Sequence, residues 1–341
     1  MESIEQCGTE PDTRRHDRHR RRAGLKLATL AAGAAIGWPA VSRAQTFPDR
    51  PLRVVVPFAT GGGADVLGRL MARKLSEILG QPVVVENHPG AGGSLGSEMV
   101  ARGAADGYSL LIVNANAHVA NSALYSSLRY SPINDFTALG SFGIIRYVLV
   151  VGAKFPAQNF ADFTKMVHAA PGKYNYASGG VGSGPHLAME MLKQAAKLDL
   201  PHVPYKGSGP ALVDVAGGHV ATAFDNVAAI PLIRSGQLRA LAITGKRSTA
   251  LPDVPTFAEV GMPDFDVSGV FGFLAAKGLP GPVAAKLKET LLQAARDPGV
   301  QQQLVAQGID PAPGTGEQYE TVLKNESVRW ERVIKAAGIK L

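Results

Sequence analysis

The first strong pattern in the chain is a β-branched run that ends in glycines. Residues 52–56 read LRVVV and predict a short buried strand, which Pro57 ends before Gly61–Gly63. From Ala64 onward, apolar residues recur at helical spacing until Gly80. The apolar face of this predicted helix comprises Val66, Leu67, Leu70, Met71, Leu75, Ile78 and Leu79.

This strand, glycine turn and helix start together indicate an anion site. Glycines let the backbone come close to a ligand, and the free N–H groups in the first turn of a helix attract negative charge. No Lys follows Gly61–Gly63, whereas a phosphate-binding P-loop requires a GK[ST] sequence. The favoured ligand is therefore a carboxylate rather than a nucleotide phosphate.

Strand and helix continue to alternate along the chain. Short apolar runs predict strands at 83–85, 110–113, 147–151, 174–177, 221–224 and 238–243. Apolar residues between Tyr319 and Ile334 predict a closing C-terminal helix. Such alternation predicts an α/β fold with parallel sheets, and the chain length predicts two domains.

Several of the predicted strands end in polar or glycine-rich loops. These loops are Asn114–His118, Ser178–His186, a segment in which Ser208 is the expected helix N-cap, and Asp225 with the residue after it. In open α/β sheets, ligands bind outside the carboxyl ends of the strands. Loops after separate strands are thus expected to converge on one small molecule between two domains.

The N-terminal segment predicts export. Arg14–Arg22 is strongly basic, Leu25–Ile36 is apolar, and Ser42–Ala44 supplies small residues for signal peptidase, which we expect to cut after Ala44. The apolar run is too short for a membrane span of about 20 residues. Arg21–Lys26 resembles a twin-arginine signal, and an ordinary Sec signal fits equally well. Either route delivers residues 45–341 to the periplasm.

Composition narrows the possible chemistry. The chain has a net charge of +7 with no dense basic stripe interleaved with aromatics, which disfavours nucleic-acid binding. Cys7 is the only cysteine and lies in the expected leader, so the exported chain has no disulfide and no thiolate metal site. H-E-x-x-H and G-x-G-x-x-G patterns are absent as well, so neither a metal nor a cofactor is expected.

An ordered set of short motifs extends over essentially all of the exported chain. The motifs are Phe47–Pro51, PFATGGGAD at 57–65, PVVVENHPGAGGSLG at 82–96, DGY at 106–108, HVPYKGSGPAL at 202–212, FDN at 224–226 and LPDVPT at 251–256. In this order they resemble the Bug family, the TctC-like periplasmic solute-binding proteins of tripartite tricarboxylate transporters. The resemblance implies the two-lobed periplasmic-binding-protein type II (Venus-flytrap) fold, with a ligand cleft between the lobes. Residues 45–146 plus 268–341 would form lobe one, and residues 147–267 would form lobe two.

The resemblance also implies a set of ligand contacts and a partner. Lobe one would bind a small organic carboxylate through Phe58, Thr60, Gly61, Gly62, Asn114, Asn116 and His118, and lobe two through Ser178, Gly182, Ser183 and Asp225. The family commonly has Thr, Ser or Gly where this chain has Asn114 and Asn116. The partner would be a membrane transporter with one large and one small integral subunit, and the binding protein itself would be a monomer.

Each of these residues also has a structural interpretation. Asn114 and Asn116, or Ser178 and Ser183, could cap the helices that follow them. His118, one of the expected contacts, and His186 could each either contact the ligand or serve only in internal hydrogen bonds. A carboxylate at Asp225 would repel an anion, so it would accept from an ammonium, hydroxyl or water, or it would pin its own loop.

Two other functions remain open from the sequence. A closed, ligand-bound form could signal to a receptor kinase instead of a transporter. A periplasmic hydrolase is the remote alternative, because Gly92–Gly96 matches G-x-S-x-G around Ser94. That motif works only on a strand-to-helix elbow, and His88–Gly90 separates Ser94 from the preceding predicted strand. The chain is therefore expected not to be an enzyme.

Overall fold

The computed structural model describes residues 47–125, 127–226 and 228–337. The expected export signal at 1–44, with its cleavage point after Ala44, lies outside these residues. The described residues belong to the compact unit Phe47–Leu341. Among them, no helix has both the length and the apolar character that crossing a bilayer requires.

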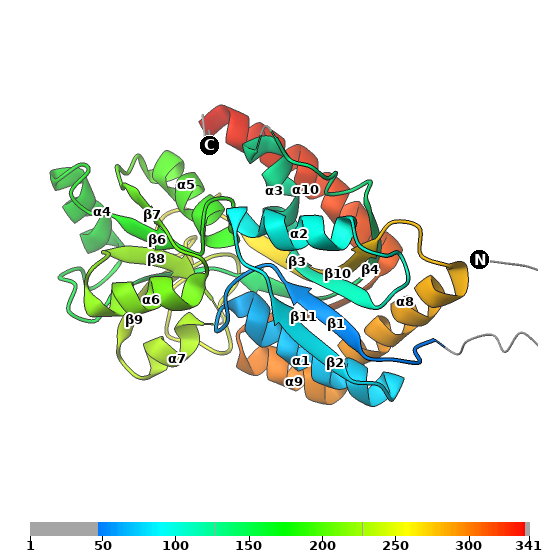
Figure 1. Ribbon diagram of the computed structural model, residues 1–341. Helices are drawn as coiled ribbons and strands as arrows, with labels where there is room; N and C mark the ends of the chain where they lie inside the picture. The colour runs from blue at the N-terminus through cyan, green and yellow to red at the C-terminus, as the bar shows by residue number, and fades with distance from the viewer. Residues whose placement is uncertain (1–46, 126, 227, 338–341) are drawn as a thin grey trace, which may run out of the picture. The chain divides into compact units, whose positions relative to one another are not determined.

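The strands form two separate sheets (Figure 1). Sheet A has the order β11-β4-β10-β3-β1-β2, and sheet B has the order β7-β6-β8-β5-β9. The strands of sheet A are β1 (Leu52–Val56), β2 (Val83–Asn87), β3 (Ser109–Asn114), β4 (Phe136–Arg146), β10 (Ser268–Ala276) and β11 (Ile309–Thr315). Those of sheet B are β5 (Val148–Gly152), β6 (Tyr176–Ser178), β7 (His202–Pro204), β8 (Thr222–Asp225) and β9 (Leu238–Ile243).

Both sheets are mixed, which corrects the expectation of parallel sheets. Strand β1 pairs in parallel with β2 and β3, whereas β10 runs antiparallel to β3 and β4. In sheet B, β6 is parallel to β7 and β8, whereas β5 is antiparallel to β8 and β9. Most of the antiparallel pairs involve the two strands that enter a sheet from the other sheet. Strand β5 follows β4 into sheet B, β10 follows β9 into sheet A, and each runs antiparallel to both of its neighbours.

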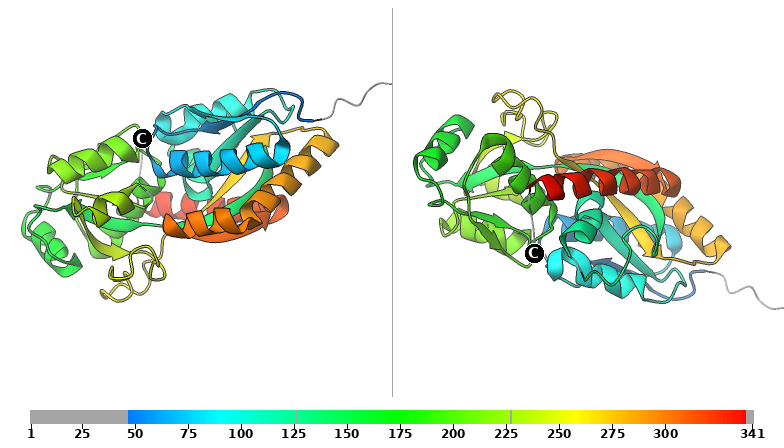
Figure 2. Two further views of the ribbon diagram at one scale, coloured as in Figure 1. Left: turned by 90° about the horizontal axis from the view of Figure 1, so that it is seen from below. Right: turned by 90° about the horizontal axis from the view of Figure 1, so that it is seen from above.

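Helices cover sheet A on both faces. On one face lie α1 (Gly63–Leu79), α8 (Gly281–Arg296) and α9 (Pro298–Ala306). On the other lie α2 (Ser94–Ala101), α3 (Ala115–Leu124) and α10 (Gly316–Ala337), with α10 packed along α3 (Figures 1 and 2). Gly80 ends α1 in the left-handed conformation, and its N–H donates to the carbonyl of Ser76.

Sheet B carries shorter helices. These are α4 (Phe160–Ala169), α5 (Gly184–Ala196), α6 (Ser208–Gly217) and α7 (Ala229–Arg234). Helix α5 follows β6 and packs on β8, and α6 covers β5, β6 and β8 from the other side (Figure 1). A short 3₁₀ turn, η1 (Ala91–Gly93), precedes α2.

Trp330 anchors the long C-terminal helix to the core of sheet A. Its side chain is fully buried, and its indole N–H donates to Glu326 Oε2 at 2.8 Å. On the same helix, Val328 is 60% exposed. The sequence pattern between Tyr319 and Ile334 therefore predicted both the helix and its buried face correctly.

Replacing Trp330 should reveal how much of the stability depends on α10. We expect Trp330→Ala to lower the free energy of unfolding by about 3–5 kcal/mol, because it leaves a large cavity in a close-packed core. Val328→Ala is the matched control and should change it by less than about 0.5 kcal/mol. Urea denaturation followed by circular dichroism measures both, and equal effects would show that α10 is not packed as described.

Candidate functional site

A small cavity lies where loops from both sheets meet. It has a volume of about 60 Å³. Its lining residues are Phe58, Gly62, Gly63, Ala64, Asn114, Ala117, Ile145, Tyr147, Gly179, Ser183, Gly184, Pro185, Ser208, Asp225, Asn226 and Phe271. Most of them follow the carboxyl ends of β1, β3, β6 and β8, which is where ligands bind in α/β folds.

Helix N-termini supply the positive potential of the cavity. Helices α1, α5 and α6 begin at Gly63, Gly184 and Ser208, all of which line it, and α3 begins directly after the lining residue Asn114. The first N–H groups of a helix have no intrahelical acceptor, and the helix dipole adds about half a positive charge there. No Lys or Arg is among the described lining residues. The arrangement therefore suits a small anion held by backbone N–H groups.

Asn114 and Tyr147 form a buried polar pair on the cavity wall. Asn114 Oδ1 caps α3 by accepting from the N–H of Asn116 at 3.1 Å, and its Nδ2 donates to Tyr147 Oη at 2.7 Å. Burial raises the pKa of the Tyr147 phenol far above its usual value, so the hydroxyl keeps its proton. Because Asn114 occupies an acceptor position of that oxygen, its proton is available to a carboxylate.

Asp225 lies at the carboxyl end of β8 and is held by its own loop. Its Oδ1 accepts from the N–H of Asn226 at 2.7 Å, and the hydroxyl of Ser208 and the N–H groups of Ala228 and Ala229 also donate to the carboxylate. Burial raises its pKa, and these hydrogen bonds oppose the rise. The side chain both lines the cavity and holds its own loop by hydrogen bonds. The ligand-site interpretation and the structural interpretation of Asp225 are therefore compatible.

Five of the eleven residues expected to bind the ligand line the cavity: Phe58, Gly62, Asn114, Ser183 and Asp225. The other six are Thr60, Gly61, Asn116, His118, Ser178 and Gly182, and in the described structure each bonds within the protein instead. Thr60 donates to Asn87 Oδ1 at 3.2 Å, and the N–H of Gly61 donates to Asp65 Oδ2 at 3.0 Å. These two residues therefore stabilise the turn next to the cavity and do not line the cavity itself.

Asn116 and His118 bond to neighbouring segments of the protein and do not line the cavity. Asn116 Nδ2 donates to the carbonyl of Ser268 at 2.5 Å. His118 Nε2 lies 2.9 Å from the carbonyl of Pro132, and burial lowers its pKa to about 4, so the ring is neutral at pH 7 and its Nε2–H donates. Ser178 contacts the half-buried His202, and Gly182 contacts the buried His186, both behind the cavity-lining loop.

Several lining residues were not predicted to contact the ligand, among them Tyr147, Ser208, Asn226 and Phe271. Tyr147 was identified only as the start of an apolar strand, and no pattern marks its hydroxyl as facing a cavity. Ser208 was expected to be the N-cap of α6, but that position belongs to Gly207. Ser208 begins the helix, and this places its hydroxyl within reach of Asp225.

The loops that follow the strands of sheet A and of sheet B contact each other through their backbones. The N–H of Ala59, after β1, donates to the carbonyl of Lys206, after β7, at 3.1 Å. A Cβ on Gly207 would lie 2.9 Å from Ala59 Cβ and 3.2 Å from its nitrogen. Because φ at Gly207 is 163°, the backbone itself tolerates any residue, and only the close approach requires glycine here.

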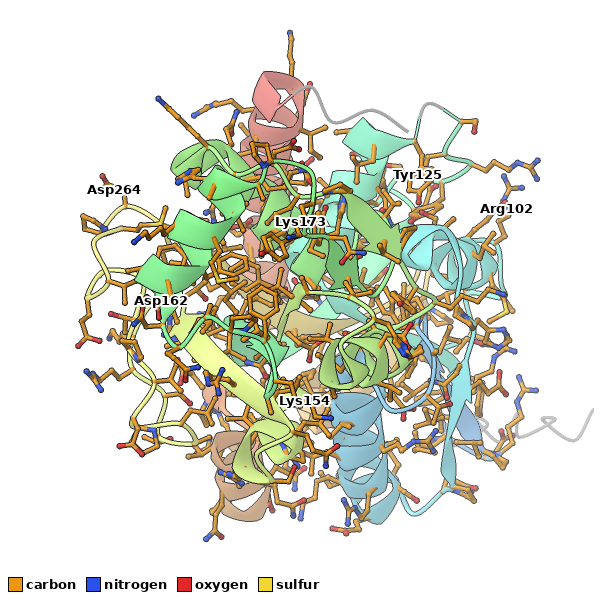
Figure 3. The ribbon with its side chains drawn as sticks, turned by 90° about the vertical axis from the view of Figure 1, so that its left-hand side faces the viewer. Arg102, Tyr125, Lys154, Asp162, Lys173 and Asp264 are labelled. Carbon is orange, nitrogen blue, oxygen red and sulfur yellow. The ribbon has the colours of Figure 1, made fainter. Side chains whose placement is uncertain are left out.

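A larger depression of about 600 Å³ lies at the opposite ends of the sheet-B strands. Its lining residues include Lys154, Lys173 and His219, and both lysines are visible on the face turned to the viewer in Figure 3. Helix α6 presents its C-terminal residues 215–217 to this depression, and the carbonyl end of a helix repels anions. The smaller cavity is thus the better candidate for a carboxylate.

Ser94 lacks the setting of a hydrolase nucleophile. Strand β2 ends at Asn87 and η1 intervenes before Ser94, so no strand-to-helix elbow forms. Its hydroxyl is buried and has no hydrogen-bond partner among the described residues. Within the same part of the chain, no group of three or more His, Cys, Asp or Glu side chains could hold a metal ion.

The close approach at Gly207 yields a direct test of the site. We expect Gly207→Ala to weaken carboxylate binding by about tenfold or more, because the added methyl group pushes the Ala59 and Lys206 loops apart. Gly217→Ala at the other end of α6 is the control, since its Cβ would meet only the flexible His219 ring at 3.7 Å. Calorimetric titration measures both, and equal affinity of the two variants would contradict closure through these loops.

Sequence comparison identifies relatives over nearly the whole chain. The profile of the family described as "Tripartite tricarboxylate transporter family receptor" matches residues 67–339. Protein BugT from Bordetella pertussis is 38% identical over 321 residues, covering 93% of this chain and 97% of BugT.

Solved structures show the same fold. MatC (Rpa3494) from Rhodopseudomonas palustris with bound malate is 33% identical, with a TM-score of 0.79, over 84% of this chain and 100% of that one. R. palustris Rpa4515 with adipate is 34% identical, with a TM-score of 0.82, over 86% of this chain and 100% of that one. Both of these ligands are small dicarboxylates.

Proposed function

Because this chain belongs to the tripartite tricarboxylate transporter receptor family, we propose that it captures a small organic carboxylate for a tripartite transporter. The single observation that carries the proposal is the convergence of helix N-termini on a cavity whose described lining residues include no Lys or Arg. Malate and adipate in the related structures support the same ligand class.

We propose that the carboxylate is bound by N–H groups of the first turns of α1, α5 and α6 and by the hydroxyls of Tyr147 and Ser183. Phe58, Ile145 and Phe271 would contact the carbon chain, since they are the large apolar side chains of the lining. Asp225 would hold Ser208 and the start of α7 in place rather than contact the anion directly. Five of the residues expected from the sequence thus remain in the proposed site.

We further propose that residues 45–146 plus 268–341 form lobe one and residues 147–267 form lobe two. The membership of the two sheets supports these bounds, because the chain leaves sheet A after Arg146 and returns to it at Ser268. Ligand binding would shift an equilibrium between open and closed lobes, and the contact between the Ala59 and Lys206 loops would belong to the closed form.

The location and the partner follow from the same proposal. The basic and apolar N-terminal segment supports export to the periplasm, where the protein would act as a monomer. Its closed form would dock on the large and small integral subunits of the transporter. Membership of a receptor family supports binding rather than catalysis.

The first experiment is to identify the ligand. Residues 45–341 purified from the periplasm should carry or bind a small carboxylate, detected by native mass spectrometry and by a thermal-shift panel of mono-, di- and tricarboxylates. We expect at least one acid to raise the melting temperature at micromolar concentration, because it binds only the folded state. A protein that none of the acids stabilises would contradict the proposed function.

Tyr147→Phe tests the proposed hydroxyl contact. We expect affinity for the identified carboxylate to fall by about tenfold, because a hydrogen bond to a charged group is lost and Asn114 Nδ2 loses its acceptor. Tyr319→Phe is the matched control, as this buried hydroxyl donates to the carbonyl of Val113 and does not line the cavity. An unchanged affinity of Tyr147→Phe would remove Tyr147 from the site.

A further inference from the structure

The loop between β6 and α5 is supported from behind by two histidines. Its residues Gly179, Ser183 and Gly184 line the cavity, whereas Ser178 and Gly182 do not. Those two residues contact His202 of β7 and His186 of α5 instead. The segment Ser178–Gly184, here called the ligand loop, therefore has one side on the cavity and the other on the histidine pair.

The hydrogen bonds define the protonation of both rings. Gly182 N–H donates to His186 Nδ1 at 3.2 Å, so Nδ1 must carry no proton. Ser178 Oγ lies 2.7 Å from His202 Nε2, accepts from the N–H of Gly180 at 3.1 Å and donates to the carbonyl of Gly180 at 3.2 Å. With the hydroxyl proton assigned to that carbonyl, His202 Nε2 is assigned as the donor to Ser178 Oγ.

The two imidazoles are stacked together with a tyrosine. The ring centroids of His186 and His202 are 4.4 Å apart, and that of Tyr176 lies 4.6 Å from that of His202. Tyr176 donates to Glu190 Oε1 at 2.5 Å, and Lys193 Nζ lies 2.7 Å from the same oxygen. Lys193, on the same helix, thus neutralises the charge of Glu190. A protonated histidine in the stack would place a second positive charge beside Lys193.

Burial keeps both rings neutral at pH 7. It lowers the pKa of His186 to about 4, where the charge of Glu190 opposes the shift and Lys193 adds to it. It lowers the pKa of His202 to about 3, and His186 and Lys193 add to that shift. Ionisable groups also lie on the neighbouring elements among the described residues. These groups bond to partners other than the two histidines: Asp225 of β8, Asp214 of α6, His118 of α3, and Glu326 with Arg329 of α10.

We propose that His186 and His202 are positioning residues, which as neutral rings hold the ligand loop in its binding shape and on protonation release it and the ligand. A protonated His186 would turn an Nδ1–H donor toward the N–H of Gly182, so two donors would face each other. The inference rests on the proposed function, because it names how that same site would be regulated.

The direction of the pH effect follows from linkage. In the held loop the histidines bind protons only near pH 4 or below, whereas in a released loop their ordinary pKa is about 6.5. As the pH falls, the released form therefore takes up protons first. For each histidine, the population ratio of held to released form falls by up to about tenfold per pH unit. Binding should decline between about pH 6.5 and 4.

Two substitutions separate proton uptake from packing. His186→Asn places an amide oxygen near the position of Nδ1, and His202→Gln places an amide N–H near Nε2, and neither side chain titrates. His186→Leu removes the acceptor altogether. His168→Asn is the matched control, because this exposed histidine bonds only the carbonyl of Ala196 on another part of lobe two.

The first measurement needs no ligand. Hydrogen–deuterium exchange of residues 178–184 is compared at pH 7 and 5 in the mature protein, after correction for intrinsic exchange. We expect protection to fall at least tenfold at pH 5 in wild type and in His168→Asn, and to stay constant in the His186→Asn, His202→Gln double variant. An equal loss of protection in wild type and double variant would overturn the proposal.

The second measurement uses malate and adipate as probes in calorimetric titrations over the same pH range. Wild-type affinity should fall more steeply than that of the double variant, and His186→Leu should bind at least tenfold more weakly than His186→Asn at pH 7. Parallel pH profiles would overturn the proposal. If neither acid binds wild type at pH 7, the failure concerns the choice of ligand, and the exchange experiment still decides the role of the histidines.

Discussion

The site depends on one electrostatic constraint: an anion must be held in a cavity whose described lining contains no Lys or Arg. The N-termini of α1, α5 and α6 and the capped N-terminus of α3 therefore have to converge on the same cavity. Backbone N–H groups are fixed by their helices, so they lose little conformational freedom on binding, unlike a long Lys or Arg side chain. The carboxyl ends of β1, β3, β6 and β8 lie at this cavity, so residues that follow these strands can line it.

Around this cavity, polar side chains are used mainly to hold loops. Asn114 caps α3 and also orients the Tyr147 hydroxyl, and Asp225 gathers Ser208 and the start of α7. His186 and His202 do the same for the loop between β6 and α5. Since a buried polar group without a partner is costly, each of these bonds restricts its loop to one conformation. The backbone donors are thereby preorganised for a ligand.

Many elements of the fold could be predicted from the sequence, and others could not. The β-branched run at Leu52–Val56 and the glycine that ends α1 carry strong local signals, and both elements occur where the pattern places them. Strands β4, β10 and β11 were not predicted, and β7 is only three residues long. These strands pair antiparallel to a neighbour or lie at the edge of a sheet. Their pairing depends on strands that are distant in the chain.

Local sequence determined the glycine turn after β1 and the polar loops at strand ends, because these properties depend on residue type and short-range backbone geometry. Tertiary structure alone decided which polar groups line the cavity. Ser178, Gly182, Asn116 and His118 have the right chemistry for a ligand, yet their hydrogen bonds are used inside the protein. Tyr147, with no motif around it, reaches the cavity. The physical reason is that a side chain's partner is set by packing between segments far apart in sequence, which no local pattern records.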